Sequence, residues 1–297
     1  MKKNIFKVGF CVAYDWELLK KSVPRVYERA DTICFSIDKN RKSWSGVSYV
    51  FDETAFQKFL LEVDVEKKIR VYEDDFALPN LSPIENDNRQ RNLMGKYMGE
   101  GGWHIQIDSD EYFLDFKGFT EYLCSIHRNP LPTQKPINVS VGLIPLIKKL
   151  DTGYIYIQFD KNIETAPFAT NQPIYRAARR NEHFNHIGPF IVIHETWARA
   201  EQELYHKIQN WGHRDDFNKE SYFKIWQSID EYNYLYVKDF HPIEPSVWPA
   251  LGYCKGSSID EFITNFSVSF PLSKFQLFLK NNRNIARLKH LFTKLLG

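Results

Sequence analysis

Short apolar runs alternate with longer amphipathic segments along the first half of the chain. The apolar runs predict buried strands over residues 6–14, 32–38, 68–75 and 103–108. The segments with helical periodicity predict helices over residues 15–30, 52–63, 86–102 and 116–129. Asp15 and Asp52 stand at the start of the first two helices as candidate N-caps. Strands that alternate with helices predict an α/β fold, with a mainly parallel sheet and helices on both faces.

The pattern changes after residue 136, where strand-like runs follow one another without intervening helices. These runs predict strands over residues 137–147, 153–159, 173–179 and 188–195. Helical periodicity then returns and predicts helices over residues 198–212 and 218–232. We expect one domain over residues 1–250, with halves at 1–115 and 116–250, and a helical C-terminal extension over residues 251–297.

Composition narrows the class of protein only slightly. The chain has 297 residues, enough to bury a sizeable core, and its net charge of +2 argues neither for nor against a nucleic-acid partner. The four cysteines lie far apart and form no C-x-x-C pair, which is typical of buried thiols in a reducing compartment. The opening "MKKNIFKVGFCVAYDW" predicts a first strand rather than a signal peptide. No apolar run approaches the roughly 18–20 residues of a membrane span.

The chain lacks the sequence motifs of several competing chemistries. It contains neither of the glycine-rich loops that cradle phosphates, G-x-x-x-x-G-K-[ST] and G-x-G-x-x-G. It also contains no G-x-S-x-G elbow of a hydrolase and no H-E-x-x-H helix of a zinc protease. The candidate chemistry therefore lies in the acidic and histidine-containing stretches that follow predicted strands.

The stretch "WHIQIDSDEYF", residues 103–113, gathers three carboxylates at the end of an apolar run: Asp108, Asp110 and Glu111. Aspartates two residues apart on a strand point the same way. Ligands of parallel sheets collect beyond the carboxyl ends of the strands, and Asp38 ends the second predicted strand at the same edge. Hard carboxylate oxygens suit Mg²⁺ or Mn²⁺. Because D-x-D is a short pattern, a solvated acidic turn is the alternative.

On four stretches the chain resembles the GT-A-fold glycosyltransferases, and among them the bacterial family 2 enzymes. These stretches are "AYDWELLKKSV", "CFSID", "RQRNLMGKYMGEGGWHIQIDSDEYF" and "PIYRAARRNEHFNHIGPFIVIHETW". The likeness spans residues 5–215 and departs at Asp15, which stands near the place of a common Asn, and in the C-terminal tail. The resemblance implies that residues 1–115 bind a nucleotide sugar and that residues 116–250 bind an acceptor.

The resemblance further implies a role for each carboxylate of the acidic stretch. In the family, Mn²⁺ or Mg²⁺ bridges the two phosphates of the donor and neutralises charge on the leaving nucleoside diphosphate. Asp110 would be the direct ligand of the ion, and Asp108 a ligand through water or through the ribose. Glu111 would orient both aspartates.

The same resemblance implies that other residues of the first half bind the donor. Asp38 would hold the base or the ribose of the nucleotide. Arg91, seventeen residues before Asp108, would reach the diphosphate, with Arg89 as the alternate. The competing interpretation is that both arginines are solvated charges on a helix surface.

The segment "VIHETWARAEQELYHKIQNWGHRDDF" is unusually rich in chemical groups. His194 is the candidate third metal ligand, because a neutral imidazole can complete a carboxylate site; the alternative is a satisfied histidine at a strand end. Glu195, Asp215 or Asp216 is the candidate general base that deprotonates an acceptor hydroxyl. The tryptophans of the segment either stack on a sugar ring or belong to the core: Trp197 and Trp211.

The tail over residues 271–297 has six Lys and Arg residues and no acid. Its apolar residues fall on one helical face: Ile285, Leu288, Leu291, Phe292 and Leu295. This pattern predicts either a helix packed on the main domain or a reversible contact with an anionic membrane. Because aromatic residues do not interleave with the basic ones, we expect no nucleic-acid partner. The expected location is the cytoplasm, with a peripheral position at the inner face of the membrane as the second option.

These features predict a metal-dependent glycosyltransferase that uses Mn²⁺ or Mg²⁺. It would move a sugar from a nucleotide-diphosphate sugar to a hydroxyl of a glycan or glycolipid acceptor, with the inversion that is usual in family 2. One alternative is a nucleotidyltransferase of similar fold, which usually carries a glycine-rich loop after its first strand, and this chain has none there. The other is a catalytically inactive sugar-binding or assembly protein.

Overall fold

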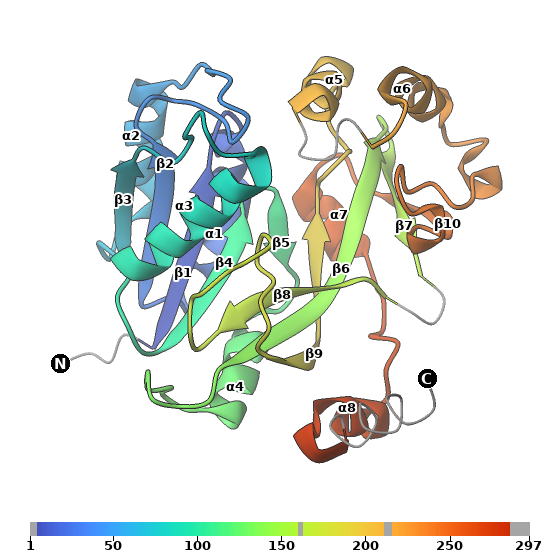
Figure 1. The fold of residues 1–297 in the computed structure, drawn as a ribbon. Helices are drawn as coiled ribbons and strands as arrows, with labels where there is room; N and C mark the ends of the chain where they lie inside the picture. Colours follow the sequence, from blue (N-terminus) through green and yellow to red (C-terminus); the bar gives the residue numbers. More distant parts are fainter. Residues whose placement is uncertain (1–4, 160–162, 211–215, 286–297) are drawn as a thin grey trace.

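The computed structural model describes residues 5–159, 163–210 and 216–285, and it shows an α/β fold built on one large sheet (Figure 1). In the first half, four parallel strands stand side by side in the order β3 (Ile69–Asp74), β2 (Thr32–Asp38), β1 (Phe6–Val12) and β4 (Trp103–Asp108). Every residue of β1 and β2 is buried, as expected for parallel strands that are covered on both faces. The four strands predicted here are confirmed.

Helices cover both faces of these four strands, as predicted. One face carries α1 (Leu19–Tyr27), α2 (Glu53–Val63) and α4 (Phe116–Ile126), whose apolar side chains share a core with Phe10. The other face carries α3 (Pro83–Tyr97). Gly9 lets α3 lie close to the sheet, because a Cβ at this position would lie 2.8 Å from the Met94 side chain.

The helix starts follow the capping signals only in part. Asp52 begins α2 by accepting the N–H of Ala55 at 2.9 Å, as expected of an N-cap. Asp15 precedes the short 3-10 helix η1 (Trp16–Leu18), but its side chain makes no capping hydrogen bond. A capping box between Ser82 and Glu85 starts α3 earlier than the apolar period indicated.

The second half extends the sheet with mainly antiparallel strands: β5 (Glu111–Phe113), β6 (Ile137–Lys149), β7 (Gly153–Gln158), β8 (Thr165–Thr170), β9 (Phe184–His194) and β10 (Ala250–Lys255). Strand β8 joins the halves by pairing with β4 and β6, and β9 pairs with β5 and β6. Among the described residues four strand pairings are parallel and five are antiparallel. The sheet as a whole is therefore mixed, and its first half is the parallel part.

One strand prediction in this half was wrong. Residues 173–179 form no strand, because the chain turns there, with the Arg180 N–H donating to the carbonyl of Ala177 at 2.8 Å. The true strand is β8, whose six residues contain Pro167 and carry little β-propensity signal. The expected helical extension over residues 251–297 also begins differently, since most of β10 lies in it, paired with β7.

The remaining helices pack on the second half of the sheet. They are α5 (Glu201–Asn210), α6 (Lys219–Ser228), the short helices η2 (Tyr234–Tyr236) and η3 (Pro245–Val247), α7 (Ile259–Asn265) and α8 (Lys274–Asn281). Helices α5 and α6 confirm the two helices predicted after residue 197. They lie at the end of the sheet where β1 and β6 finish, whereas α8 lies at the opposite end (Figure 1).

Helix α8 docks on β9 through Asn281, whose side-chain amide accepts the Ile187 N–H at 2.8 Å and donates to the Ile187 carbonyl at 2.9 Å. Its exposed face carries Phe275 and Phe278. Of the residues predicted to form the apolar face of the tail, four lie outside the described residues, which end at 285: Leu288, Leu291, Phe292 and Leu295. None of the helices within the described ranges is long and apolar enough to cross a membrane.

Lys148 of β6 fixes α6 to the sheet. Its Nζ donates to the carbonyls of Gln227 and Ile229 at 2.8 and 2.7 Å, at the C-terminal end of α6. We predict that Lys148→Met lowers the free energy of unfolding by about 1–3 kcal/mol, because the carbonyls at the C-terminal end of the helix lose a charged donor. Lys224→Met, an exposed change on the same helix, is the control and should have little effect. Equal denaturant midpoints for both variants would contradict this role for Lys148.

Candidate functional site

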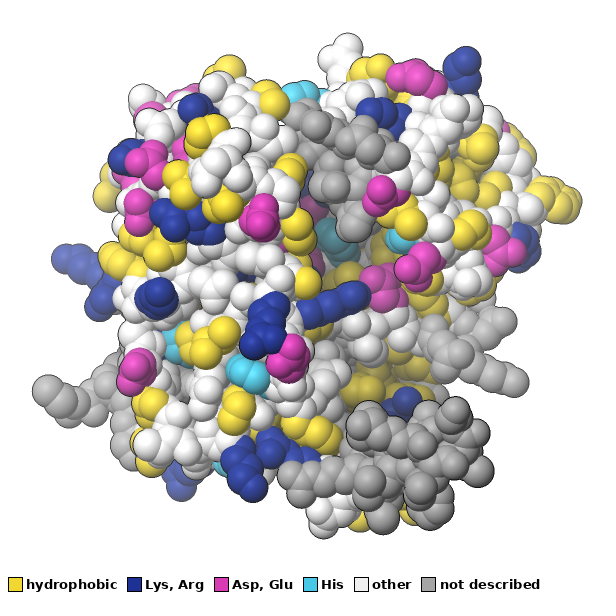
Figure 2. Space-filling view, in the orientation of Figure 1, with side chains coloured by type: hydrophobic (Ala, Val, Ile, Leu, Met, Phe, Trp, Pro, Cys, Tyr) yellow, Lys and Arg dark blue, Asp and Glu magenta, His cyan; other side chains and the backbone are white. Residues whose placement is uncertain are grey.

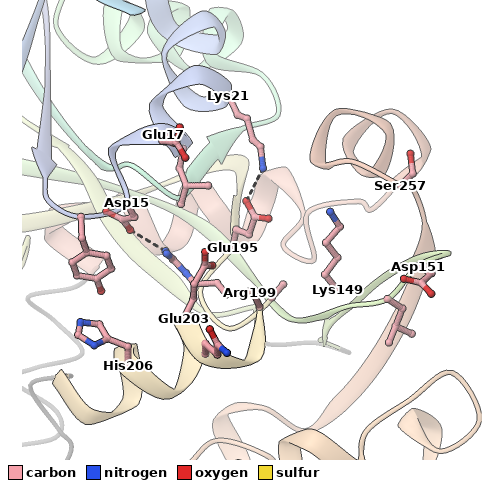
Figure 3. Close-up of a pocket in the computed structure, with 16 residues that line it drawn as sticks. Asp15, Glu17, Lys21, Lys149, Asp151, Glu195, Arg199, Glu203, His206 and Ser257 are labelled. Atoms are coloured by element: carbon pink, nitrogen blue, oxygen red, sulfur yellow. Dashed lines mark hydrogen bonds and ion pairs between the residues drawn. The ribbon is translucent and has the colours of Figure 1, made fainter. Parts of the chain in front are cut away.

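A cavity of about 870 Å³ opens at the carboxyl edge of the sheet. Four strands reach it by their carboxyl ends, and the residues that follow them line it: Tyr14 after β1, Leu150 after β6, Glu195 after β9 and Ser257 after β10. Helices α1 and α5 close its sides (Figure 3). The space-filling view shows the surface hollowed between the two halves, with histidine and acidic side chains beside the hollow (Figure 2). This is the edge at which α/β sheets bind ligands.

The acidic stretch forms a tight turn between β4 and β5 at this edge. Strand β4 ends at Asp108 and β5 begins at Glu111, so that Asp110 lies in the turn between them. The side chain of Asp110 is buried, and its Oδ2 accepts hydrogen bonds from Arg199 Nη2 at 2.6 Å and Lys207 Nζ at 3.0 Å. His194 Nε2 lies 3.5 Å from the other oxygen, Oδ1. Asp110 is therefore surrounded by cations from the chain itself.

The other two acids of the turn also have buried cationic partners. Asp108 Oδ1 accepts from Arg91 Nη2 at 2.9 Å, and Arg91 Nε donates to Asp87 at 2.6 Å within α3. Glu111 takes both Nη atoms of Arg179, at 2.5 and 2.6 Å. Protein side chains thus supply the counterions of all three carboxylates, because a buried carboxylate without a partner is costly.

These partners shift the pKa values of the cluster. Burial alone would raise the pKa of the Asp110 carboxyl, but Lys207, His194 and Arg199 hold it well below its usual value. At Asp108, burial raises the pKa of the carboxyl and Arg91 lowers it, and the net result is a lowered pKa. Both aspartates are therefore ionised at neutral pH. Burial and the neighbouring Arg199 lower the pKa of Lys207.

Arg199 connects the acidic turn to the cavity. Its Nη2 contacts Asp110 on one side and Asp15 Oδ2, at 3.0 Å, on the other. Arg199 and Asp15 both line the cavity (Figure 3), whereas Asp110 does not line it. A ligand in the cavity would meet the guanidinium of Arg199 before it met the carboxylate of Asp110.

Glu195 presents the carboxylate that is best placed for proton transfer. It lines the cavity although its side chain is only 7% exposed. Its Oε2 accepts from Tyr112 OH at 2.6 Å and lies 3.5 Å from Lys21 Nζ. His194 is the last residue of β9, and Glu195 is the next residue of the chain. Their side chains point in different directions: His194 lies beside Asp110, and Glu195 lines the cavity.

Several predicted donor contacts have other partners in the structure. Both oxygens of Asp38 are taken by backbone N–H groups, from Asn40 and Lys42 on Oδ1 and from Phe76 and Ala77 on Oδ2. Four donors fill the ordinary capacity of a carboxylate, so this geometry favours a role in fastening the loops after β2 and β3.

The predicted phosphate-binding arginines also lie away from the cavity wall. Arg91 is buried between Asp87 and Asp108, so it is not the solvated charge of the alternative interpretation. Arg89 turns to the carbonyl of Asp75 at 3.3 Å, beyond β3. A direct contact of Arg91 or Arg89 with a diphosphate therefore remains a prediction.

The remaining candidates of the second cluster are placed as follows. Trp197 belongs to the core, where its ring contacts Trp248 and Tyr222. Asp216 is exposed, just before α6. Two candidates lie outside the described residues: Trp211 and Asp215.

Sequence reasoning missed the cations that complete the site. Arg199 and Lys207 contact Asp110 from 89 and 97 positions away, and Arg179 contacts Glu111 from 68 positions away. The available signal was their place in the chain. Arg199 and Lys207 follow a strand that ends in His-Glu, and the polypeptide leaves such a strand at the ligand-binding edge.

The acidic turn can be tested for its fit to a divalent ion. Asp110 Oδ1 and His194 Nε2 lie 3.5 Å apart, which lets one ion contact both at the usual distance of about 2.0–2.2 Å. Asp108 is partly exposed beside them. No group of three or more potential ligands is assembled within the described part of the chain. The donor set therefore fits an ion that takes its other ligands from water or from a substrate.

Comparison with known protein families and with curated proteins identifies no match for this sequence.

The contact between His194 and Asp110 predicts a particular pH dependence of stability. Burial alone would lower the pKa of His194, but the carboxylate of Asp110 raises it above its usual value. The stabilising effect is thus fully present below the unfolded-state pKa of about 6.5 and is lost as the pH rises through the folded-state pKa. We expect the wild type to lose more free energy of unfolding than His194→Gln as the pH rises from about 6.5 into the alkaline range.

His186 provides the control for this measurement because burial lowers its pKa. A histidine with a lowered pKa has the opposite effect on stability: its contribution to the free energy of unfolding increases as the pH rises toward about 6.5. Denaturant titrations of the wild type, His194→Gln and His186→Gln across the range separate the two effects. Identical pH profiles for the wild type and His194→Gln would show that the contact with Asp110 contributes nothing.

Proposed function

We propose that this protein is a glycosyltransferase that moves a sugar from a nucleotide-diphosphate donor to an acceptor hydroxyl. The observation that carries the proposal is the juxtaposition of two features at one sheet edge. One is the ionised turn with Asp110, surrounded by buried cations, and the other is the adjacent polar cavity with Glu195. The sequence likeness to the GT-A-fold enzymes supports the same interpretation.

The donor end of the proposed site is the cationic group around Asp110. Arg199 and Lys207 share one oxygen of Asp110, and Arg199 also contacts Asp15, so two cations with several N–H donors are gathered at this end of the site. An anionic diphosphate would find charge-assisted donors there, and a guanidinium can bind it with two parallel N–H groups. The partly exposed Asp108 would face the donor beside them.

A divalent ion fits the same place. Asp110 and His194, with Asp108, would hold it, and Mn²⁺ or Mg²⁺ would supply Lewis-acid neutralisation of the leaving diphosphate. Since metal binding requires neutral His194, whose pKa is raised, occupation of the site would release a proton.

The acceptor end of the proposed site is the cavity. Most of its lining side chains are charged or polar, in contrast to the apolar lining of typical small-molecule pockets, and this suits a hydroxyl-rich ligand. Glu195 would take the proton of the attacking hydroxyl as general base. The hydrogen bond from Tyr112 OH holds one oxygen of Glu195 in place and leaves the other to the acceptor. A single base fits direct displacement with inversion at the anomeric carbon.

Donor binding can be screened by thermal unfolding with a panel of nucleotide sugars, with and without Mn²⁺. A donor at about one hundred times its dissociation constant should add about 2.7 kcal/mol of stability, or roughly 5–10 °C in Tm. Asp110→Asn should lose the part of the shift that depends on Mn²⁺. The proposal would be contradicted if no nucleotide sugar shifted Tm, or if the Mn²⁺-dependent shift were equal in the variant.

Turnover separates an enzyme from a sugar-binding or assembly protein. Glu195→Gln should bind the donor normally and transfer the sugar about 10²–10⁴-fold more slowly, because the positioned base is lost. Glu201→Gln is the control, since this exposed carboxylate belongs to α5, a helix of the cavity wall, but does not itself line the cavity. Transfer at the wild-type rate by Glu195→Gln would exclude Glu195 as the base, and donor binding without any transfer by the wild type would favour the binding protein.

A further inference from the structure

The loop between β8 and β9 carries an arginine into the buried side of the acidic turn. Both Nη atoms of Arg179 contact Glu111, at 2.5 and 2.6 Å, and Nη1 also donates to the carbonyl of Gln106 at 3.2 Å. The guanidinium lies 4.2 Å from the ring centroid of Phe168. The side chain of Arg179 is 11% exposed and that of Glu111 is 0% exposed. This planar, two-bond contact uses the full geometry of a guanidinium.

Glu111 connects Arg179 to Asp108, one of the candidate metal ligands. Its Oε2 also accepts the backbone N–H of Asp108 at 2.8 Å. The carboxylate of Asp108 is meanwhile held by Arg91 at 2.9 Å. The backbone and the side chain of Asp108 are therefore fixed from two directions, one through Arg179 and the other through Arg91.

Both of these restraints depend on α3. Arg91 belongs to this helix, and so do Asn88 and Asn92, which lie on the same face at spacings of three and four residues. The Asn92 side chain accepts the Tyr175 N–H at 3.0 Å and donates to the Tyr175 carbonyl at 2.9 Å. Asn88 donates to the carbonyl of Arg176 at 2.8 Å. Helix α3 thus holds the start of the loop that carries Arg179.

The backbone of the loop is strained where it presents Arg179. Ala178 has a φ of +51°, a region that side chains other than glycine seldom occupy. The tight turn from Ala177 to Arg180 closes around it with a 2.8 Å hydrogen bond. A strained conformation persists only where the surroundings hold it, and here the neighbouring Arg179 is held by Glu111.

We propose that Arg179 is a positioning residue that sets the orientation of Asp108 and Asp110 through Glu111. This inference rests on the proposed function, because it assigns a role in that site. The turn is short, so a displacement of Glu111 moves both aspartates relative to a bound donor. A misplacement of about 1 Å at a reacting site can cost on the order of 10²-fold in rate.

The test must separate positioning from stability. Arg179→Met leaves Glu111 buried and unpaired, so this variant should be destabilised and is not decisive by itself. The double variant Arg179→Met/Glu111→Gln removes the unpaired charge and should recover stability without recovering the contact. Arg176→Gln is the matched control, because this exposed arginine of the same loop pairs with the exposed Glu182.

The first readout is hydrogen exchange of the Asp108 amide, followed by NMR, and it needs no ligand. In the double variant this amide should exchange roughly tenfold faster or more than in Glu111→Gln alone, in Arg176→Gln and in the wild type, because the acceptor on residue 111 is no longer held by Arg179. Unchanged exchange at Asp108 in a stable double variant would overturn the inference, whether or not the protein turns over a nucleotide sugar.

The second readout is kcat for the nucleotide sugar that the thermal screen identifies. A positioning role predicts a fall of about 10²-fold in the double variant at restored stability, with Arg176→Gln at the wild-type rate. A merely structural role predicts that kcat recovers together with Tm, and that result would also overturn the inference. If the wild type turns over no nucleotide sugar, the proposed function fails, and the amide exchange still decides the role of Arg179 in the turn.

Discussion

The enclosure of the acidic turn, with the carboxylates of Asp110 and Glu111 buried and that of Asp108 partly exposed, is the constraint on which the rest of this structure depends. Removing a carboxylate from water costs several kcal/mol unless a cation and hydrogen bonds replace the solvent. The cations come from four parts of the chain: Arg91 on α3, Arg179 in the loop after β8, Arg199 after β9 and Lys207 on α5. The turn therefore joins the parallel half of the sheet to the antiparallel half by charge as well as by strand pairing.

The same electrostatic arrangement gives the site its chemical character. Because the pKa values of Asp108 and Asp110 are lowered, their oxygens are ionised and suited to a metal ion or a donor ribose. The cations around Asp110 add positive charge where a diphosphate would bind, and Arg199 carries that charge to the wall of the cavity. Glu195 lies on the same wall, one residue beyond His194. A donor and an acceptor could therefore meet between groups that the fold has already fixed.

The sequence allowed the strands and helices of the first half to be predicted, because buried parallel strands and amphipathic helices have distinct periods. It also placed Asp110 and His194 at one sheet edge, where they lie 3.5 Å apart. The cationic partners of Asp110 were not predicted, since nothing in the local sequence of Arg199 and Lys207 marks them as buried, and only their place after the strand that ends in His-Glu indicated this edge. For Arg91 and Asp38 the sequence indicated contacts with the donor, but in the structure both side chains contact other groups of the protein. Strand β8 was missed because its short sequence carries a proline and no alternation.

The most direct test of this account is a crystal structure of the protein with Mn²⁺ and the nucleoside diphosphate of the proposed donor. The account predicts an ion about 2.0–2.4 Å from a nitrogen of His194 and an oxygen of Asp110. It also predicts diphosphate oxygens within hydrogen-bonding distance of Arg199 or Lys207. A diphosphate bound elsewhere on the chain, with the contacts of Asp110 unchanged, would contradict it.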